Sequence, residues 1–207
     1  MSAVRTGTAG WVYEPWRGTF FPAGLVQKKE LAYASSRLTT IEINATFRAS
    51  QKPESFRKWA GETPAGFLFS IKGPQLVTHI RRLRDCRPEL ANFFASGPLA
   101  LGEKLGPFIW QLPPSLNHDA DLLGEFLALL PHTAEAYLAL AREADERLKS
   151  PPFVDFPPGI MLRHAIELRH PSFNRPEVLD LLRRHNVAWV ISDTAEQPDR
   201  HVTADFV

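Results

Sequence analysis

Several short apolar segments of the sequence end in a polar or charged side chain. In residues 40–44, Ile41 and Ile43 alternate with Glu42 and Asn44. Alternate residues of a β-strand point to opposite faces, so this spacing predicts a strand with the isoleucines on one face and the polar pair on the other. Later segments repeat the pattern, and their polar side chains are Lys72, Gln111, Glu167, Arg169 and Asp193.

This set of side chains could carry out acid–base chemistry. A nearby cation favours the ionised form of a carboxylate and burial favours the protonated form, so two carboxylates in such a set acquire different pKa values. We therefore interpret Glu42 and Glu167 as a catalytic acid–base pair, and Lys72 as a third catalytic candidate because a desolvated lysine is a nucleophile. Arg169 could bind a phosphate or carboxylate through its guanidinium. The alternative is a set of solvated strand ends or structural ion pairs.

Two histidines near these segment ends are further binding candidates. His79 follows the third segment and His170 the fifth. Each could transfer a proton or donate a hydrogen bond to an anion, or be an ordinary loop residue. With Glu42, Glu167 and Asp193 they could hold a divalent metal ion, but the sequence has no His-x-His or His-Glu-x-x-His spacing. We therefore predict no metal and no cofactor.

Two other groups of residues could contact a ligand. A basic cluster, which is either a solvated helix face or a site for a sugar phosphate or a nucleic-acid backbone, consists of Arg81, Arg82, Arg84 and Arg87. An aromatic group follows the first segment and consists of Trp11, Tyr13, Trp16, Phe20 and Phe21. Most of these rings are expected to pack in the core, and Trp11 is the candidate for stacking on a sugar or base.

Short β-type segments alternate with helical segments along most of the chain. The expected strands are Val4–Gly7, Thr40–Asn44, Phe67–Lys72, Phe108–Leu112, Ala165–Arg169, Ala188–Asp193 and Ala204–Val207. The expected helices are Leu25–Arg37, Pro53–Ala60, Leu122–Leu130 with Asp119 or Asp121 as its cap, Thr133–Lys149 and Pro176–His185. Strand–helix alternation of this kind predicts a parallel sheet with right-handed crossovers.

Seven expected strands nearly suffice for an eight-stranded α/β barrel of the TIM type, and this is the fold class that we predict. Residues 1–207 are expected to form a single domain, with a helical and proline-rich insertion at residues 133–159. In such a barrel the polar strand ends converge on one mouth. The chain ends inside an expected strand, and barrels of this class take about 250 residues, so we expect the final strand and helix to be missing.

Composition excludes several classes of protein. The 207 residues carry 24 Lys+Arg and 23 Asp+Glu, so the chain lacks the overall charge of a dedicated nucleic-acid or membrane-surface binder. No apolar run approaches the length of a membrane-spanning helix, of about 20 residues. The single cysteine, Cys86, allows no disulfide within the chain. We expect a soluble, cytoplasmic protein without a membrane partner.

The order and spacing of many short motifs resemble the YecE-like family, a domain of unknown function. The matching motifs are Gly7–Tyr13, Trp16–Gly18, Glu42–Phe47, Lys72–Pro74 with Thr78 and His79, Leu101–Pro107, Gln111–Pro114, Glu167–Ser172 and Asp193. This resemblance covers essentially the whole chain from Val4 and implies a TIM-like barrel with a polar pocket at the strand ends. The pocket residues that it implies are Glu42, Asn44, Lys72, His79, Gln111, Glu167, Arg169, His170 and Asp193.

The chain departs from the family pattern at two positions and at its end. Arg48 and Phe173 stand where family members often have an aromatic residue and a tryptophan. Family members also usually continue beyond Val207 into a strand that ends in an Arg-Leu-His-Gly-like motif. The two substitutions affect the stacking surface of the implied pocket, and the resemblance supplies no established reaction.

Three functions are compatible with these residues. The first is an enzyme that uses the paired carboxylates, with Lys72 and Arg169, on a small polar or anionic ligand such as a sugar or sugar phosphate. The second is a nucleic-acid-binding or nuclease-like barrel, which the basic cluster suggests. The third is a ligand-binding protein without catalytic activity. The sequence does not specify a substrate or an oligomeric state.

Overall fold

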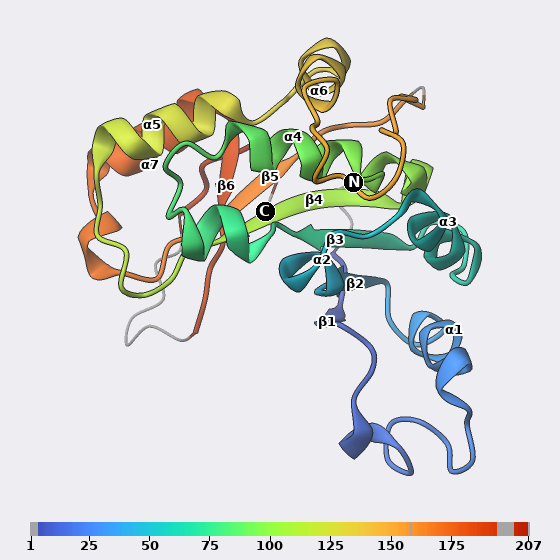
Figure 1. Cartoon of the computed structure of the whole chain (residues 1–207). Helices are drawn as coiled ribbons and strands as arrows, with labels where there is room; N and C mark the ends of the chain where they lie inside the picture. Colours follow the sequence, from blue (N-terminus) through green and yellow to red (C-terminus); the bar gives the residue numbers. More distant parts are fainter. Residues whose placement is uncertain (1–3, 158, 194–200, 207) are drawn as a thin grey trace.

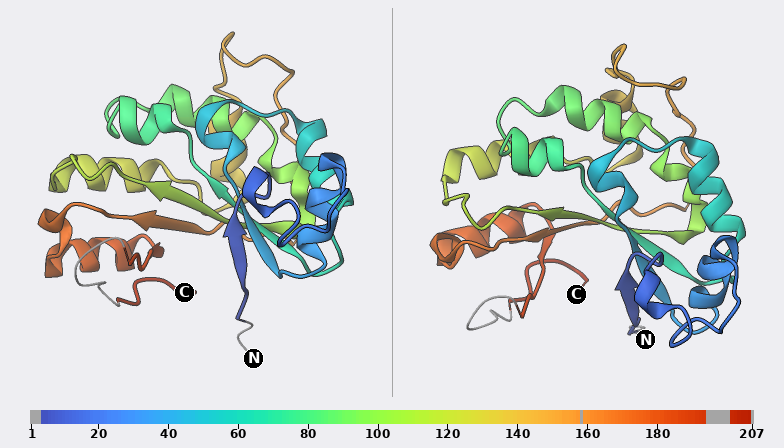
Figure 2. Two further views of the ribbon diagram at one scale, coloured as in Figure 1. Left: turned by 90° about the horizontal axis from the view of Figure 1, so that it is seen from below. Right: turned by 60° about the horizontal axis from the view of Figure 1, so that its bottom comes forward.

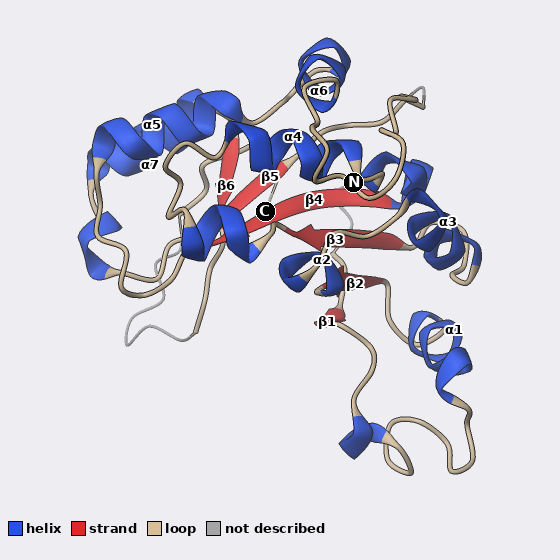
Figure 3. Ribbon diagram, viewed as in Figure 1, coloured by secondary structure: helices blue, strands red, loops and turns tan. Residues whose placement is uncertain are grey.

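Six parallel strands form one sheet, and every strand pairs with the next strand along the chain (Figure 1). The structure is a computed structural model that describes residues 4–157, 159–193 and 201–206. Within these residues the strands are β1 (Gly7–Ala9), β2 (Thr40–Ile43), β3 (Leu68–Lys72), β4 (Leu105–Gln111), β5 (His164–Glu167) and β6 (Val187–Trp189). Figure 3 shows them as a twisted fan, with β1 and β6 as its two edges. The chain is therefore an α/β protein with an all-parallel sheet, and the strands of the described residues do not close into a barrel.

Helices connect successive strands, as parallel pairing requires. The α-helices are α1 (Glu30–Ser35), α2 (Ala45–Arg48), α3 (Pro53–Gly61), α4 (Arg87–Ala95), α5 (Ala120–Leu129), α6 (Ala134–Ala141) and α7 (Pro176–Arg184). Shorter 3-10 turns are η1 (Glu14–Trp16), η2 (Gln27–Lys29), η4 (Pro98–Lys104) and η5 (Pro171–Phe173), and η3 (Leu76–Ile80) is a π-helical turn. Figure 2 shows α4 and α5 along the same side of the sheet. No helix of the described residues is long and apolar enough to cross a membrane.

The apolar face of the sheet forms the core beneath these helices. Phe69, Ile71, Phe108 and Trp110 are fully buried. The ring of Trp110 packs edge-on against Phe126 of α5, with centroids 5.4 Å apart. Burial alternates along β2 and β3, so the polar side chains of these strands point to the other face, as the sequence pattern predicts.

A neutral histidine lies within this core. The indole Nε1 of Trp110 donates a hydrogen bond to Nδ1 of His164 at 3.2 Å, and Nε2 of His164 lies 2.8 Å from the carbonyl oxygen of Pro131. Burial lowers the pKa of His164 to about 3. The ring is therefore uncharged, accepts at Nδ1 and donates at Nε2, and connects β4 and β5 to the segment after α5.

The first strand lies further along the chain than expected. β1 begins at Gly7, where the expected strand Val4–Gly7 ends. A Cβ atom at Gly7 would lie 2.1 Å from the carbonyl oxygen of Thr40, so the absence of a side chain lets β1 approach β2.

The last expected strands are shorter or absent. β6 ends at Trp189, four residues before Asp193. The expectation of a strand at 204–207 is wrong for residues 204–206, which form no strand, and Val207 lies outside the described residues. The hydroxyl of Thr203 donates to the carbonyl oxygen of Val187 at 2.7 Å and accepts from the amide of Trp189 at 2.8 Å. A side chain, and not a further strand, thus satisfies these edge groups of β6.

The insertion contains a shorter helix than Thr133–Lys149. Thr133 caps α6, which ends at Ala141. The segment after it is held by side chains instead: Arg147 donates to Asp145 at 2.6 Å and to Glu89 of α4 at 3.0 Å. Helix α4 was not among the expected helices, and its carboxylate Glu89 also accepts from Arg81 at 3.0 Å.

We predict that Glu89→Gln lowers the free energy of unfolding by about 1–3 kcal/mol. The substitution replaces a buried carboxylate with a neutral amide, and so removes the negative charge that Arg81 and Arg147 both contact. Burial would raise the pKa of Glu89, but its own backbone amide and the two arginines outweigh burial and lower it. The stabilisation is therefore present above the unfolded-state pKa and is lost as the pH falls through the lower folded-state pKa.

Urea unfolding of both proteins between neutral and acid pH tests this prediction. The difference between wild type and variant should shrink in acid. Glu54→Gln, on the exposed surface of α3, is the matched control and should change little. An unchanged unfolding midpoint for Glu89→Gln would show that the ion pairs contribute nothing to stability.

Candidate functional site

The register of the parallel strands places four of the candidate side chains on one face. Glu42 pairs in register with Ser70, two residues before Lys72, and Gln111 pairs with Glu167. Lys72 pairs with Ile109, two residues before Gln111. Registered residues of parallel strands point to the same side, so Glu42, Lys72, Gln111 and Glu167 all lie opposite the apolar core. We call these four residues and Arg169 the polar cluster.

Direct contacts connect the members of the polar cluster. Nζ of Lys72 lies 3.6 Å from Oε1 of Glu42. Nε2 of Gln111 donates to Oε2 of Glu167 at 2.6 Å, and Nε of Arg169 donates to Oε1 of Glu167 at 2.5 Å. Both oxygens of Glu167 are therefore held in place, whereas Glu42 has a single, longer ion pair.

The two carboxylates influence one another. Burial raises the pKa of Glu42, the charge of Lys72 opposes this rise, and the charge of Glu167 adds to it. Glu42 and Glu167 thus lie close enough to interact, and Glu42 binds its proton more tightly than an exposed glutamate does. A raised pKa of this kind favours the role of a proton donor.

His79 lies beside the polar cluster on the π-helical turn η3. Its Nδ1 is 2.9 Å from the hydroxyl of Thr78, and its ring packs edge-on against Phe47 with centroids 5.1 Å apart. Nζ of Lys72 lies 5.3 Å from the centroid of the same Phe47 ring. Burial lowers the pKa of His79, as do the charges of Arg169, Lys72 and Arg82. His79 is thus a neutral imidazole among three cations.

The backbone around His79 is unusual. π-Helical turns are rare and often occur at functional sites. Three residues that follow η3 without being glycine have positive φ angles, 53° at Arg82, 70° at Leu83 and 45° at Asp85. Such conformations are strained and persist only where the surrounding structure enforces them. The guanidinium of Arg82 is held by two hydrogen bonds to Ser115, at 3.1 and 2.7 Å.

Asn44 and His170 are oriented by loops at the strand ends. Asn44 follows β2 and lies near Gly10, where a Cβ atom would be 3.5 Å from its Nδ2. Nδ1 of His170 lies 2.8 Å from the hydroxyl of Ser172, which accepts from the backbone amide of His118 at 2.7 Å. These contacts fix the His170 ring and leave its Nε2 without a hydrogen bond within the described residues.

The structure does not bring Trp11 or Asp193 to the polar cluster. The ring of Trp11 packs against Trp59 of α3 and Phe69, with centroids 5.6 and 6.4 Å apart, on the apolar side of the sheet. Asp193 is exposed beyond the end of β6. Because β6 ends at Trp189, strand alternation gives no orientation for Asp193, and its part in the site stays a prediction. Trp11 follows Gly10, whose φ is 84°, and its ring lies on the core side.

The sequence analysis did not single out two residues that shape this region. Phe47 contacts both Lys72 and His79, and Thr46 joins β2 to β3 because its hydroxyl contacts the carbonyl oxygens of Ile43 and Lys72, at 3.0 and 2.6 Å. Both belong to the motif Glu42–Phe47, so the motif itself was the available signal.

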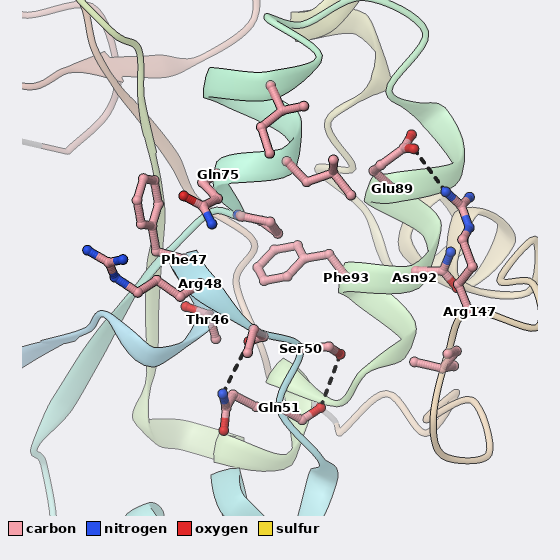
Figure 4. A pocket seen from close by; sticks show the side chains of 15 residues that line it. Thr46, Phe47, Arg48, Ser50, Gln51, Gln75, Glu89, Asn92, Phe93 and Arg147 are labelled. Carbon is pink, nitrogen blue, oxygen red and sulfur yellow. Dashed lines mark hydrogen bonds and ion pairs between the residues drawn. The ribbon is translucent and has the colours of Figure 1, made fainter.

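A mostly apolar cavity of about 340 Å³ lies behind Phe47 (Figure 4). Phe93 of α4, Gln75 and Leu76 line it together with residues 46–51. Arg48, the departure from the family pattern, is exposed at its rim, and its guanidinium is directed away from Phe93 in Figure 4. The cavity thus borders the polar cluster but shares none of its five residues.

Three arginines of the basic cluster form ion pairs with carboxylates of the fold. Arg81 contacts Glu89, Arg84 lies 3.5 Å from Asp119, and Arg87 forms two hydrogen bonds to Glu143.

Burial raises the pKa of Cys86 to about 12, so this thiol is not a nucleophile at neutral pH. No group of three or more His, Cys, Asp or Glu side chains is placed to hold a metal ion in the described part of the chain.

Residues 5–207 match the family described as "Protein of unknown function DUF72". The chain belongs to this family. It is 28% identical over 129 residues to the UPF0759 protein YecE of Escherichia coli and 29% identical over 116 residues to the UPF0759 protein YunF of Bacillus subtilis. These matches cover 62% and 54% of the chain but only 44% and 40% of the two relatives, so the chain matches less than half the length of either.

Two solved DUF72 structures share the fold of this chain. The protein from Thermotoga maritima superposes with a TM-score of 0.69 at 24% identity, over 96% of this chain and 70% of that one. The protein from Enterococcus faecalis gives a TM-score of 0.58 at 18% identity, over 97% and 69%. These similarities support the arrangement of the parallel sheet and its helices.

We predict that Lys72→Met raises the pKa of both Glu42 and His79. Lys72 stabilises the Glu42 carboxylate and disfavours the His79 imidazolium, so its removal makes both groups hold a proton more tightly. NMR titration of the His79 ring and the Glu42 side chain measures both values. The control Lys28→Met, on the exposed turn η2, should shift neither, and unchanged values in Lys72→Met would show that Lys72 does not act on these groups.

Proposed function

We propose that this DUF72 chain is part of an enzyme that performs acid–base chemistry on a small polar or anionic ligand, such as a sugar or sugar phosphate. The observation that carries the proposal is that Glu42 and Glu167 lie on one face of the sheet in different surroundings. Glu42 has a raised pKa and a single ion pair, whereas Glu167 accepts two hydrogen bonds. Carboxylates in unlike environments commonly divide the roles of acid and base.

Glu42 is the proton donor in this proposal, and Glu167 is the proton acceptor. Gln111 and Arg169 hold Glu167 in one orientation. Lys72 and Arg169 stabilise negative charge on the ligand or in the transition state. Asn44 and His170 contribute hydrogen bonds at the rim, and the proposal includes no metal or other cofactor.

The proposal includes a TIM-like barrel as the complete architecture. Sequential parallel strands with helices on the apolar face are typical of such barrels, and their active sites lie at the carboxyl ends of the strands. Glu42, Lys72, Gln111 and Glu167 lie at or near the ends of β2, β3, β4 and β5. This placement matches the mouth of a barrel.

The test begins with a screen of sugars and sugar phosphates for turnover by the full-length protein. With any substrate found, we expect Glu42→Gln and Glu167→Gln to reduce turnover by about 100-fold or more while both remain folded, because general acid–base catalysis typically contributes 10²–10⁴-fold. Glu177→Gln, at the exposed start of α7, is the control. Normal turnover in both variants would refute the assignment, and tight binding without conversion of any ligand would favour a binding protein.

A nucleic-acid-binding function predicts a different result. It requires binding that weakens steeply with salt, because phosphate contacts release counterions. The pairing of Arg81, Arg84 and Arg87 with carboxylates leaves little free charge for such contacts. We therefore expect a fluorescently labelled DNA or RNA oligonucleotide to show no anisotropy change at low salt, and salt-sensitive binding would favour the nucleic-acid function instead.

A further inference from the structure

The polar cluster and the neighbouring His79 contain hydrogen-bonding nitrogens that the fold does not fully satisfy. Nε of Arg169 donates a hydrogen bond to Glu167. The two terminal nitrogens of Arg169 have no hydrogen bond within the described residues. Lys72 Nζ is 3.6 Å from Glu42, which exceeds the usual hydrogen-bond range of about 2.7–3.2 Å. His79 uses only Nδ1, in its contact with Thr78. Partly buried polar groups whose hydrogen bonds are long or incomplete favour binding of an acceptor-rich group.

Positive charges outnumber negative charges around His79. Three cations, Lys72, Arg82 and Arg169, act on His79. The carboxylates among them are Glu42 and Glu167, and burial keeps Glu42 protonated to a higher pH than an exposed glutamate. The region therefore carries a net positive charge at neutral pH, and a bound anion would neutralise it.

The three side chains come from different elements, and the charges of Lys72 and Arg169 both act on His79. Phe47 fixes two of them, because Lys72 Nζ and the His79 ring lie 5.3 and 5.1 Å from its ring centroid. Arg169 follows β5 and is positioned by Glu167. All three side chains are only partly exposed, with 15% of Lys72 and 30% of Arg169 accessible. A recessed set of this kind fits a small group rather than an extended polymer.

We propose that Lys72, His79 and Arg169 bind the phosphate group of a small phosphorylated ligand. The two terminal nitrogens of a guanidinium match two phosphate oxygens, and the ammonium group contributes a point charge. Arg82 adds positive charge while its own donors remain on Ser115. The role of this ligand as a substrate rests on the proposed acid–base function, but the binding itself does not.

Phosphate binding is coupled to protonation of His79. Among the charged groups near His79, Lys72 of β3, Arg82 beyond η3 and Arg169 beyond β5 all disfavour its imidazolium. A phosphate seated among them offsets these charges and so raises the pKa of His79. Because linkage is reciprocal, protonation of His79 strengthens the binding of a given ionic form of phosphate.

The experiment uses calorimetry with inorganic phosphate, glucose 6-phosphate and glucose, together with NMR titration of His79. We expect both phosphates to bind with one site per chain, glucose to bind at least tenfold more weakly, and phosphate to raise the His79 pKa. Arg169→Gln should weaken phosphate binding by about tenfold, because a charge-assisted hydrogen bond is lost. Arg184→Gln, on the exposed end of α7, is the matched control and should bind as wild type.

Glu42→Gln separates this inference from the proposed function. It removes the acid but none of the three phosphate donors, so phosphate binding should persist while any turnover is lost. The inference is overturned if neither phosphate binds, if Arg169→Gln binds phosphate like wild type, or if phosphate leaves the His79 pKa unchanged. Displacement of bound phosphate by a DNA oligonucleotide at low salt, with a steep salt dependence, would also overturn it in favour of a nucleic-acid site.

Discussion

The register between β4 and β5 is the constraint on which the candidate site depends. It places Gln111 directly opposite Glu167, so that the amide can hold one carboxylate oxygen at 2.6 Å. A shift by one residue would turn Glu167 into the apolar core and bring Ile166 to the polar face. The Trp110–His164 hydrogen bond on the opposite face specifies the same register from the core side. A diagonal core contact and a polar contact between registered residues are thus consistent with one alignment.

His164 and His79 are both disfavoured as cations, but for different physical reasons. In the core, burial keeps His164 neutral, and two hydrogen bonds satisfy its ring nitrogens. On the polar face, His79 is also disfavoured as a cation, but three neighbouring positive charges contribute to this in addition to burial. The first histidine has no free ring nitrogen and is structural, whereas the second keeps one free.

Strand alternation was sufficient to predict which face Glu42, Lys72, Gln111 and Glu167 share, because each lies within a strand whose neighbours are apolar. It gives no orientation for Asp193, since β6 ends at Trp189 and periodicity carries no information beyond a strand. It also could not predict α4 or the role of Phe47. These depend on contacts between distant segments, such as Arg147 with Glu89 and Phe47 with Lys72 and His79. Closure of a barrel likewise depends on pairing that local patterns do not encode.

The strain beside His79 gives a physical reason to regard this region as more than a set of structural ion pairs. A fold that needed only to neutralise Glu42 and Glu167 could do so with Lys72, Gln111 and Arg169. It would not require a π-helical turn, or left-handed backbone at Arg82 and Leu83, conformations that cost of order 1–3 kcal/mol each. These features bring Arg82 and the neutral His79 close to Lys72 and Arg169, and repulsion among the three cations disfavours this arrangement. Repulsion of this kind is relieved when an anion binds.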